Sequence, residues 1–199
     1  MKATREKNFN KPIILIKILD DDSLLVVDAD TTVRYLDKTN FSILNGFKAN
    51  IKHERYKTNV VSFTTTGSFF AAMSADCKES VLYNAQTKKM IAKMNRHQGE
   101  VSCVGIDPKN RYMFSCGDDG KTFVVDIKSG KLAFTLPVHV DTVNDIVFSD
   151  NSQWIATCSY DRKISLFNLA MMTPKDKLKA HSAPITKLKF LTDHRLFKT

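Results

Sequence analysis

Short apolar runs separated by polar turns dominate the 199-residue chain. Residues 143–148, 153–158 and 163–167 are rich in Val, Ile, Phe and Thr, and clusters of Asp, Asn, Ser and Gly stand between them. Runs of about four to eight such residues, bounded by turn-forming residues, are typical of β-strands. No long stretch shows the periodicity of an amphipathic helix. The pattern therefore predicts an all-β fold.

These runs recur with a period of 42 residues. Its markers are His97, His139 and His181, and the same spacing separates Asp119 from Asp161. Each of the first two histidines precedes its aspartate by 22 residues. Four strands in a unit of roughly 40–45 residues make one blade of a β-propeller. A two-helix repeat of the same length fits poorly, because the units read as strands.

Two segments at the ends of successive units carry a family resemblance. Residues 116–126 (CGDDGKTFVVD) and 158–168 (CSYDRKISLFN) resemble the end of a WD repeat, and the upstream histidines match the Gly-His position of that family. The tryptophan of the Trp-Asp pair is replaced by Leu36, Tyr83, Val125 and Phe167. The chain is thereby identified as similar to the WD-repeat (WD40) β-propellers, with four-stranded antiparallel blades.

The resemblance implies a single propeller region over residues 1–199. Blades are expected at 13–46, 58–95, 101–137 and 143–180, with a partial fifth at 185–199. About four and a half blades do not close the seven-bladed ring typical of the family. The remaining blades are therefore expected from a missing C-terminal segment or from another chain. Residues 1–12 are expected to form either a latch strand or a flexible N-terminus.

The resemblance also implies a hydrogen-bonded network in each unit. A short acidic side chain in the turn between the second and third strands can accept bonds from turn N–H groups. In the family it also bonds the histidine of its unit, with a Ser or Thr between them. The expected members are His97, Ser115 and Asp119; His139, Thr157 and Asp161; and, in the less regular units, Asp30, Asp76 and His181. Because the set repeats, it indicates a structural role rather than a hydrolytic triad, so no catalytic residue is predicted.

The net charge of +9 adds an electrostatic hypothesis. Loops that lead into innermost strands are expected to gather on one face of a propeller, and here they are basic. The residues concerned are Lys52, His53, Arg55, Lys57, Arg96, Lys175, Lys177 and Lys179. We expect this face to bind another protein that has an acidic surface; a solvated rim of lysines is the alternative. Nucleic acid is not expected, because aromatic residues do not interleave with the basic ones.

The cysteine spacing and the length of the apolar segments bear on metal binding, localisation and membrane insertion. Cys77, Cys103, Cys116 and Cys158 form no C-x-x-C pair and match no zinc spacing, so neither a metal nor another cofactor is predicted. Unpaired thiols favour a cytoplasmic protein. No apolar run approaches the roughly 20 residues that cross a membrane, and Lys17 interrupts the run at residues 13–19.

These observations predict a non-catalytic scaffold for protein–protein interaction that presents propeller loops to a partner. Two alternatives stay open. One is an accessory protein of a bacterial respiratory or redox system, such as a nitrate reductase, which rests on a fold-level analogy with small bacterial WD-repeat proteins. The other is an enzyme or cofactor-bearing propeller.

Overall fold

The computed structural model describes residues 8–30, 32–48, 61–64, 66–74, 77–136, 139–171, 173–179, 181–191 and 196–198. All regular secondary structure within these ranges is β-strand, which confirms the predicted fold class. The first two sheets contain β1 (Ile13–Ile18), β2 (Leu24–Asp28), β3 (Thr32–Leu36) and β4 (Ile43–Lys48), then β5 (Val61–Phe63), β6 (Phe69–Met73), β7 (Ser80–Asn84) and β8 (Lys89–Met94).

The next two sheets have the same layout. They contain β9 (Val101–Ile106), β10 (Tyr112–Gly117), β11 (Thr122–Asp126) and β12 (Leu132–Leu136), then β13 (Val143–Phe148), β14 (Trp154–Ser159), β15 (Lys163–Asn168) and β16 (Thr173–Lys179). A two-stranded sheet, β17 (Leu188–Phe190) and β18 (Leu196–Lys198), follows. In every four-stranded sheet the strands pair antiparallel in chain order, as in a propeller blade.

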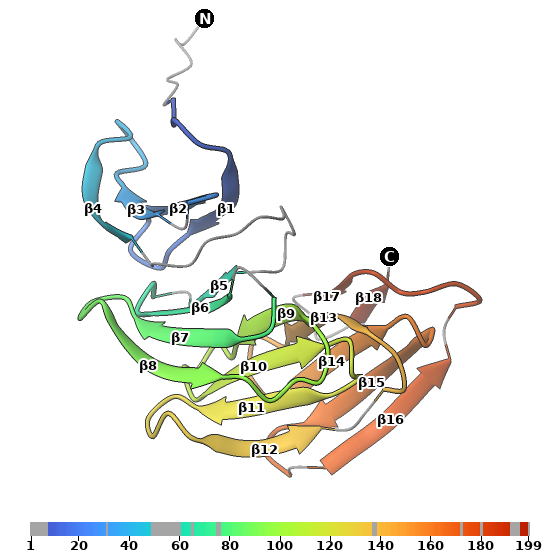
Figure 1. Ribbon diagram of the computed structural model, residues 1–199. Helices are drawn as coiled ribbons and strands as arrows, with labels where there is room; N and C mark the ends of the chain where they lie inside the picture. The colour runs from blue at the N-terminus through green and yellow to red at the C-terminus, as the bar shows by residue number, and fades with distance from the viewer. Residues whose placement is uncertain are drawn as a thin grey trace, which may run out of the picture.

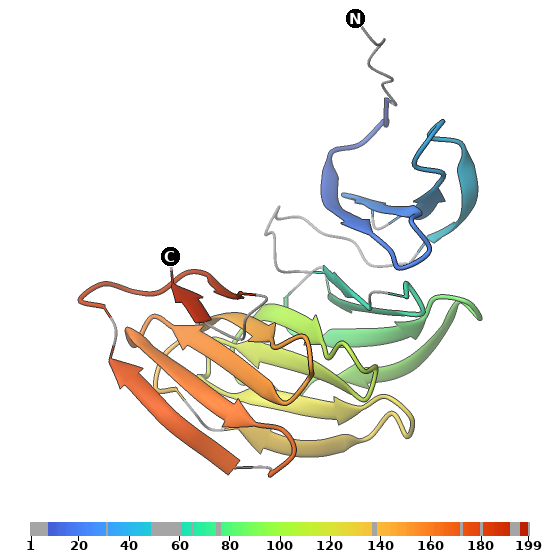
Figure 2. The same ribbon diagram turned by 180° about the vertical axis from the view of Figure 1, so that it is seen from behind.

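The second, third and fourth blades and the last two strands follow one another around a common centre. Strands β5, β9, β13 and β17 lie next to one another toward the middle, whereas β8, β12 and β16 lie at the periphery (Figure 1). The view from behind shows the same succession, with the first blade at one end and β17 and β18 beside the fourth blade (Figure 2). Residues 8–12 form no strand, and residues 1–7 lie outside the described part.

The period appears in strand register as well as in sequence. Each pairing between the third and fourth strands of a blade is shifted at one place, namely at Tyr35/Leu36, Leu82/Tyr83, Val124/Val125 and Leu166/Phe167. A β-bulge at such a shift increases the local twist of the strand and re-aims its side chains. The four bulges fall at the positions where the family has tryptophan, so each blade twists at the same point.

The residues that replace this tryptophan retain its place in the packing. Leu36, Val125 and Phe167 are buried, and Tyr83 packs against the core from a half-buried position. The Phe167 ring stacks on Phe134 at 6.0 Å between centroids. Apolar bulk at this position is therefore sufficient, since none of these four side chains supplies an indole N–H.

Hydrogen bonds from the inner strands join neighbouring blades. The Ser102 hydroxyl donates to the Val143 carbonyl, and Asn144 Nδ2 donates to the Ile185 carbonyl at 2.8 Å. Donors and acceptors alike are 42 residues apart, so the same contact joins β9 to β13 and β13 to the segment before β17. The buried Asp145 adds a bond from the Leu188 amide to its Oδ2 at 3.0 Å.

The first two blades are joined by aromatic packing and by side-chain hydrogen bonds to backbone carbonyls. The fully buried Phe70 ring meets Phe47 of the first blade at 6.3 Å and Phe63 and Tyr83 of its own blade at 4.5 and 6.1 Å between centroids. Lys17 Nζ also donates to the Phe63 carbonyl at 2.6 Å. Phe70 thus fills the space between two sheets rather than within one.

We expect Phe70→Ala to lower the free energy of unfolding by about 3–5 kcal/mol, because the substitution removes a buried ring and leaves a cavity. Urea unfolding followed by circular dichroism measures this change. Met90→Ala is the matched control, because Met90 is half exposed on β8 and its truncation is expected to cost below about 0.5 kcal/mol. Equal losses in the two variants would contradict this account of the interface.

Candidate functional site

Two kinds of loop meet at one end of the blades. The first leads into an inner strand, as residues 95–100 lead into β9 and residues 139–142 into β13. The second is the turn between the second and third strands, at residues 118–121 and 160–162. Backbone bonds join them: the Asp118 amide donates to the Glu100 carbonyl at 2.9 Å, and the Tyr160 amide donates to the Thr142 carbonyl at 3.0 Å. We call the surface formed by these loops the loop face.

In the third blade, a buried histidine ties these loops together. His97 Nδ1 lies 2.9 Å from Asp119 Oδ1, and because a carboxylate only accepts, Nδ1 donates. The ring Nε2 lies 3.0 Å from the Ser115 hydroxyl. The second carboxylate oxygen of Asp119 accepts from the Gln98 amide at 3.1 Å, and Oδ1 also accepts from the Lys121 amide at 3.1 Å. One carboxylate thus fixes its own turn and the incoming loop.

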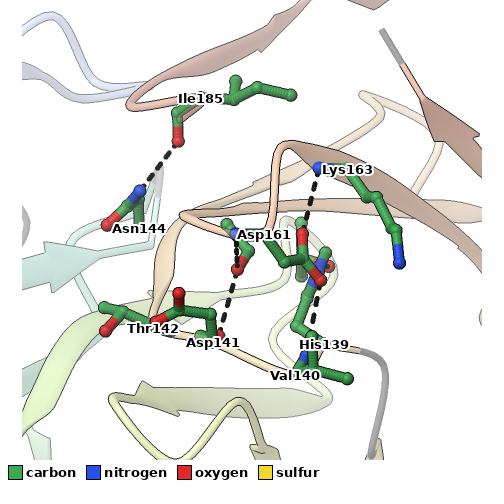
Figure 3. Close-up of polar contacts among 10 residues, drawn as sticks. His139, Val140, Asp141, Thr142, Asn144, Asp161, Lys163 and Ile185 are labelled. Atoms are coloured by element: carbon green, nitrogen blue, oxygen red, sulfur yellow. Dashed lines mark hydrogen bonds and ion pairs between the residues drawn. The ribbon is translucent and has the colours of Figure 1, made fainter. Parts of the chain in front are cut away.

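The fourth blade repeats this geometry (Figure 3). His139 Nδ1 donates to Asp161 Oδ2 at 2.9 Å, and Nε2 lies 2.9 Å from Thr157 Oγ1. The amides of Val140 and Lys163 donate to the same carboxylate at 3.4 and 3.0 Å. The His139 side chain is fully buried, and that of Asp161 is 4% exposed. The structure therefore brings together the predicted histidine, hydroxyl and aspartate in two successive blades.

The protonation state of His139 follows from its surroundings. Burial lowers the pKa of His139 below its ordinary value, the positive charge of Lys177 lowers it further, and Asp161 raises it only in part. A neutral ring suits both contacts, because Nδ1 donates to Asp161 and Nε2 can accept from the Thr157 hydroxyl. Burial raises the pKa of Asp161, but the bonds from His139, Lys163 and Val140 outweigh burial and leave it below its usual range.

The remaining predicted members of the network are placed differently. Asp76 lies outside the described residues. His181 is exposed in the segment before β17. Asp30 Oδ2 lies 3.9 Å from Lys11 Nζ, while the buried carboxylate of Asp28 accepts the turn amides of Asp30 and Thr32 at 3.0 Å each. In the first blade Asp28, which the sequence reasoning missed, performs the capping of the turn.

The predicted basic loop residues divide into three groups. Lys52, His53, Arg55 and Lys57 lie outside the described residues. Arg96 is exposed in the loop before His97. The prediction that Lys175, Lys177 and Lys179 belong to a connecting loop is wrong, because these residues lie in the outer strand β16. Lys177 pairs with Ser165 and Lys179 with Lys163 of β15, so a continuous ladder replaces the loop there.

A further set of turn residues was not identified as a site. Asn84, Asp126 and Asn168 end the third strands of their blades, and Asp37 directly follows β3. Each Oδ1 accepts one or more amides two or three residues ahead. Their 42- or 47-residue spacing was visible in the sequence, but the bonds they form were not. Such side-chain caps hold a turn without any histidine. They lie at the end of the blades opposite the loop face, since successive strands are antiparallel.

The cysteines do not form a nucleophilic or metal-binding centre within the described residues. All four are buried and form no disulfide bond. Burial raises the pKa of Cys158 to about 12, so this thiol stays protonated and unreactive at neutral pH. Among the described residues, no group of three or more His, Cys, Asp or Glu side chains could hold a metal ion, and no helix could span a membrane.

A comparison with protein families identifies the repeat. Residues 88–126 and 130–168 match the model of the family described as "WD domain, G-beta repeat". Each matched segment ends at a turn-capping residue, Asp126 or Asn168, and each runs through one network aspartate.

Three curated relatives show partial similarity. The chain is 39% identical over 72 residues to pre-mRNA-splicing factor PRP46 of Saccharomyces cerevisiae, a match that covers 36% of this chain and 16% of the relative. It is 28% identical over 98 residues to small ribosomal subunit protein RACK1 of Drosophila melanogaster, covering 49% and 30%. It is 28% identical over 104 residues to eukaryotic translation initiation factor 3 subunit I of Vanderwaltozyma polyspora, covering 50% and 30%. The matches thus span less than a third of each relative.

We expect Asp161→Asn to lower the free energy of unfolding at neutral pH by about 1–3 kcal/mol, because it weakens three hydrogen bonds to a charged, buried acceptor. Denaturant unfolding measures the loss. Asp141→Asn is the control in the same loop: its carboxylate is exposed and accepts only a local bond from the Thr142 amide among those described. A loss in the control as large as that in Asp161→Asn would argue against the network.

The lowered pKa of His139 also predicts a pH dependence. Below an unfolded-state value of about 6.5 the unfolded chain takes up a proton that the folded chain excludes, so this group lowers the stability as the pH falls. The lowered pKa of Asp161 acts in a more acidic range, below about 4. Between pH 7 and pH 5, His139→Gln should therefore flatten the fall in unfolding free energy, by a slope of at most about 1.4 kcal/mol per pH unit. An unchanged slope in this variant, with His181→Gln as the exposed control, would refute the assignment.

Proposed function

Because the chain belongs to the WD-repeat family of β-propellers, we propose that it is a non-catalytic scaffold that binds another protein through its loop face. The observation that carries this proposal is the repetition of one buried network in two blades. An enzyme needs one nucleophile and one base for its reaction, whereas a propeller needs the same hydrogen bonds in every blade to hold its loops. In both blades the histidine, hydroxyl and aspartate side chains bond to one another, and these bonds hold the loops of the loop face in fixed positions.

The relatives support an assembly role. Their names describe a splicing factor, a ribosomal subunit protein and a subunit of an initiation factor. We carry over to this chain only the role of a component that other proteins contact. The same names give no support to a bacterial respiratory or redox accessory, and that alternative is not pursued.

The charge of the chain favours an acidic partner surface. The net charge is +9, and Arg96, Arg162 and Lys177 are exposed at or beside the loop face. Long-range attraction to carboxylates would raise the association rate and make it dependent on salt. Cytoplasmic localisation is part of this proposal, supported by four buried cysteines that form no disulfide bond.

The test is cross-linking of the full chain to proteins it binds, followed by mass spectrometry. We expect cross-links from the lysines of the loop face, such as Lys121 and Lys163, and fewer from Lys109 and Lys128 at the opposite end of the blades. Raising the salt from about 50 mM to about 500 mM should weaken the association, because the Debye length falls below about 5 Å. Cross-links concentrated on Lys109 and Lys128, or affinity independent of salt, would contradict the proposal.

A further inference from the structure

The third and fourth blades build the loop face with the same backbone and different side chains. The Gln98 and Val140 amides both donate to the network aspartate, at 3.1 and 3.4 Å. Asp118 and Tyr160 both donate to the incoming loop, at 2.9 and 3.0 Å. A third pair, Gly120 and Arg162, donates within the turn at 3.2 and 3.1 Å. Every member of one blade lies 42 residues from its counterpart in the other.

The side chains of the fourth blade are unfavourable for a surface that meets only water. Val140 is 84% exposed and Tyr160 is 52% exposed, where the third blade has Gln98 and Asp118. The Val140 amide donates to the Asp161 carboxylate and the Tyr160 amide donates to the Thr142 carbonyl, so the backbone at both positions is part of the hydrogen-bonded loop face. Because the third blade makes the same turn with polar residues, the turn itself does not require these apolar groups. Exposed apolar groups on a rigid frame are typical of a contact surface.

The backbone conformation of Arg162, in the same turn as Tyr160, is energetically unfavourable for a residue other than glycine. Its φ is 67°, in the left-handed region, where the third blade has Gly120 at 72°. A residue with a Cβ is disfavoured there by roughly 1 kcal/mol relative to glycine. The arginine is exposed and stands two residues from Tyr160 in the turn, so its charge lies beside the apolar pair.

The charges around this group are mainly positive. Arg162 and Lys177 are exposed and Lys163 is half buried, against the exposed carboxylate of Asp141. The carboxylate of Asp161 faces inward to His139 and is 4% exposed. The adjoining turn of the third blade, which closes against the His139 loop, adds the exposed Asp118 and the half-buried Lys121. Cations thus outnumber carboxylates around the group, which favours an acidic segment.

From these features, and resting on the proposed function, we propose that Val140, Tyr160 and Arg162 form the contact patch for an acidic protein segment that carries an apolar side chain. The apolar side chain packs on Val140 and the Tyr160 ring, and the flanking carboxylates pair with Arg162 and the neighbouring lysines. Arginine and tyrosine are, together with tryptophan, the residues enriched at the energetic centres of protein interfaces. The fourth blade, rather than the third, then supplies the specificity of the loop face.

The third blade provides the matched variant. Val140→Gln, Tyr160→Asp and Arg162→Gly together reproduce the side chains that the third blade already folds with. This triple variant should unfold cooperatively at a midpoint no lower than the wild-type chain, and Arg162→Gly alone should raise the midpoint. Met171→Gln is the control, because Met171 is 74% exposed at the opposite end of the blade.

The binding measurement uses fluorescence anisotropy with labelled synthetic probes. The first is a short peptide of aspartate and glutamate with one central leucine, the second has glycine in place of the leucine, and the third has lysine in place of the acidic residues. We expect the full chain to bind the first probe at least about tenfold more tightly than the other two. The triple variant should lose at least about tenfold in affinity, and Met171→Gln should not change it.

Three outcomes would overturn the inference. In the first, the triple variant binds the acidic peptide as tightly as the wild-type chain does. In the second, the wild-type chain binds the three peptides equally or binds none of them. In the third, a single-stranded oligonucleotide binds more tightly than the acidic peptide, with Tyr160 as a stacking surface. If the peptides fail while partner cross-links still fall on the loop face, this patch is wrong and the scaffold function stands. If no protein cross-links there, the proposed function fails as well.

Discussion

The hydrogen bond between a buried histidine and a turn aspartate is the interaction on which the loop face depends. His97–Asp119 and His139–Asp161 each join a loop that enters a blade to a turn inside that blade. The carboxylate would be costly to bury alone, and its bonds from backbone amides and from the ring offset this cost. These buried bonds therefore fix the backbone of the loop face, and the side chains that point to solvent can vary while the turn keeps its conformation.

The blades are coupled to one another by fewer and more varied contacts. Successive inner strands share one repeated bond, from Ser102 to the Val143 carbonyl and from Asn144 to the Ile185 carbonyl. The first two blades are joined by aromatic packing around Phe70 and by hydrogen bonds such as that from the Tyr35 hydroxyl to the Gly67 carbonyl. Gly120 adds a link of another kind: a Cβ there would lie 2.5 Å from the His139 carbonyl, so the turn of one blade closes against the histidine loop of the next. Stability in such a repeat is nearly a sum of units and neighbour contacts.

The differences between blades, rather than their likeness, point to function. The third and fourth blades share the network, the turn bonds and the bulge, yet only the fourth exposes Val140 and Tyr160 at these positions. The shared network, turn bonds and bulge are explained by the need to hold each blade in the same conformation. The side chains that do not support the blade are those available for recognition, and Arg162 occupies a position where glycine fits the backbone better.

The sequence alone determined the strand class, because alternating apolar runs and turn residues record local conformation. Its 42-residue period carried a family resemblance, and that resemblance, not the apolar pattern, pointed to the histidine, hydroxyl and aspartate side chains of the two regular units. The sequence did not identify Asp28 as the turn cap of the first blade, and it assigned the Lys175–Lys179 lysines to a loop, because strand ladders depend on partners that periodicity does not reveal. Only the tertiary structure decided that residues 140, 160 and 162 share one exposed face. Exposure is a property of the neighbours that a side chain has in space, and residues 20 apart become neighbours only when the blade has folded.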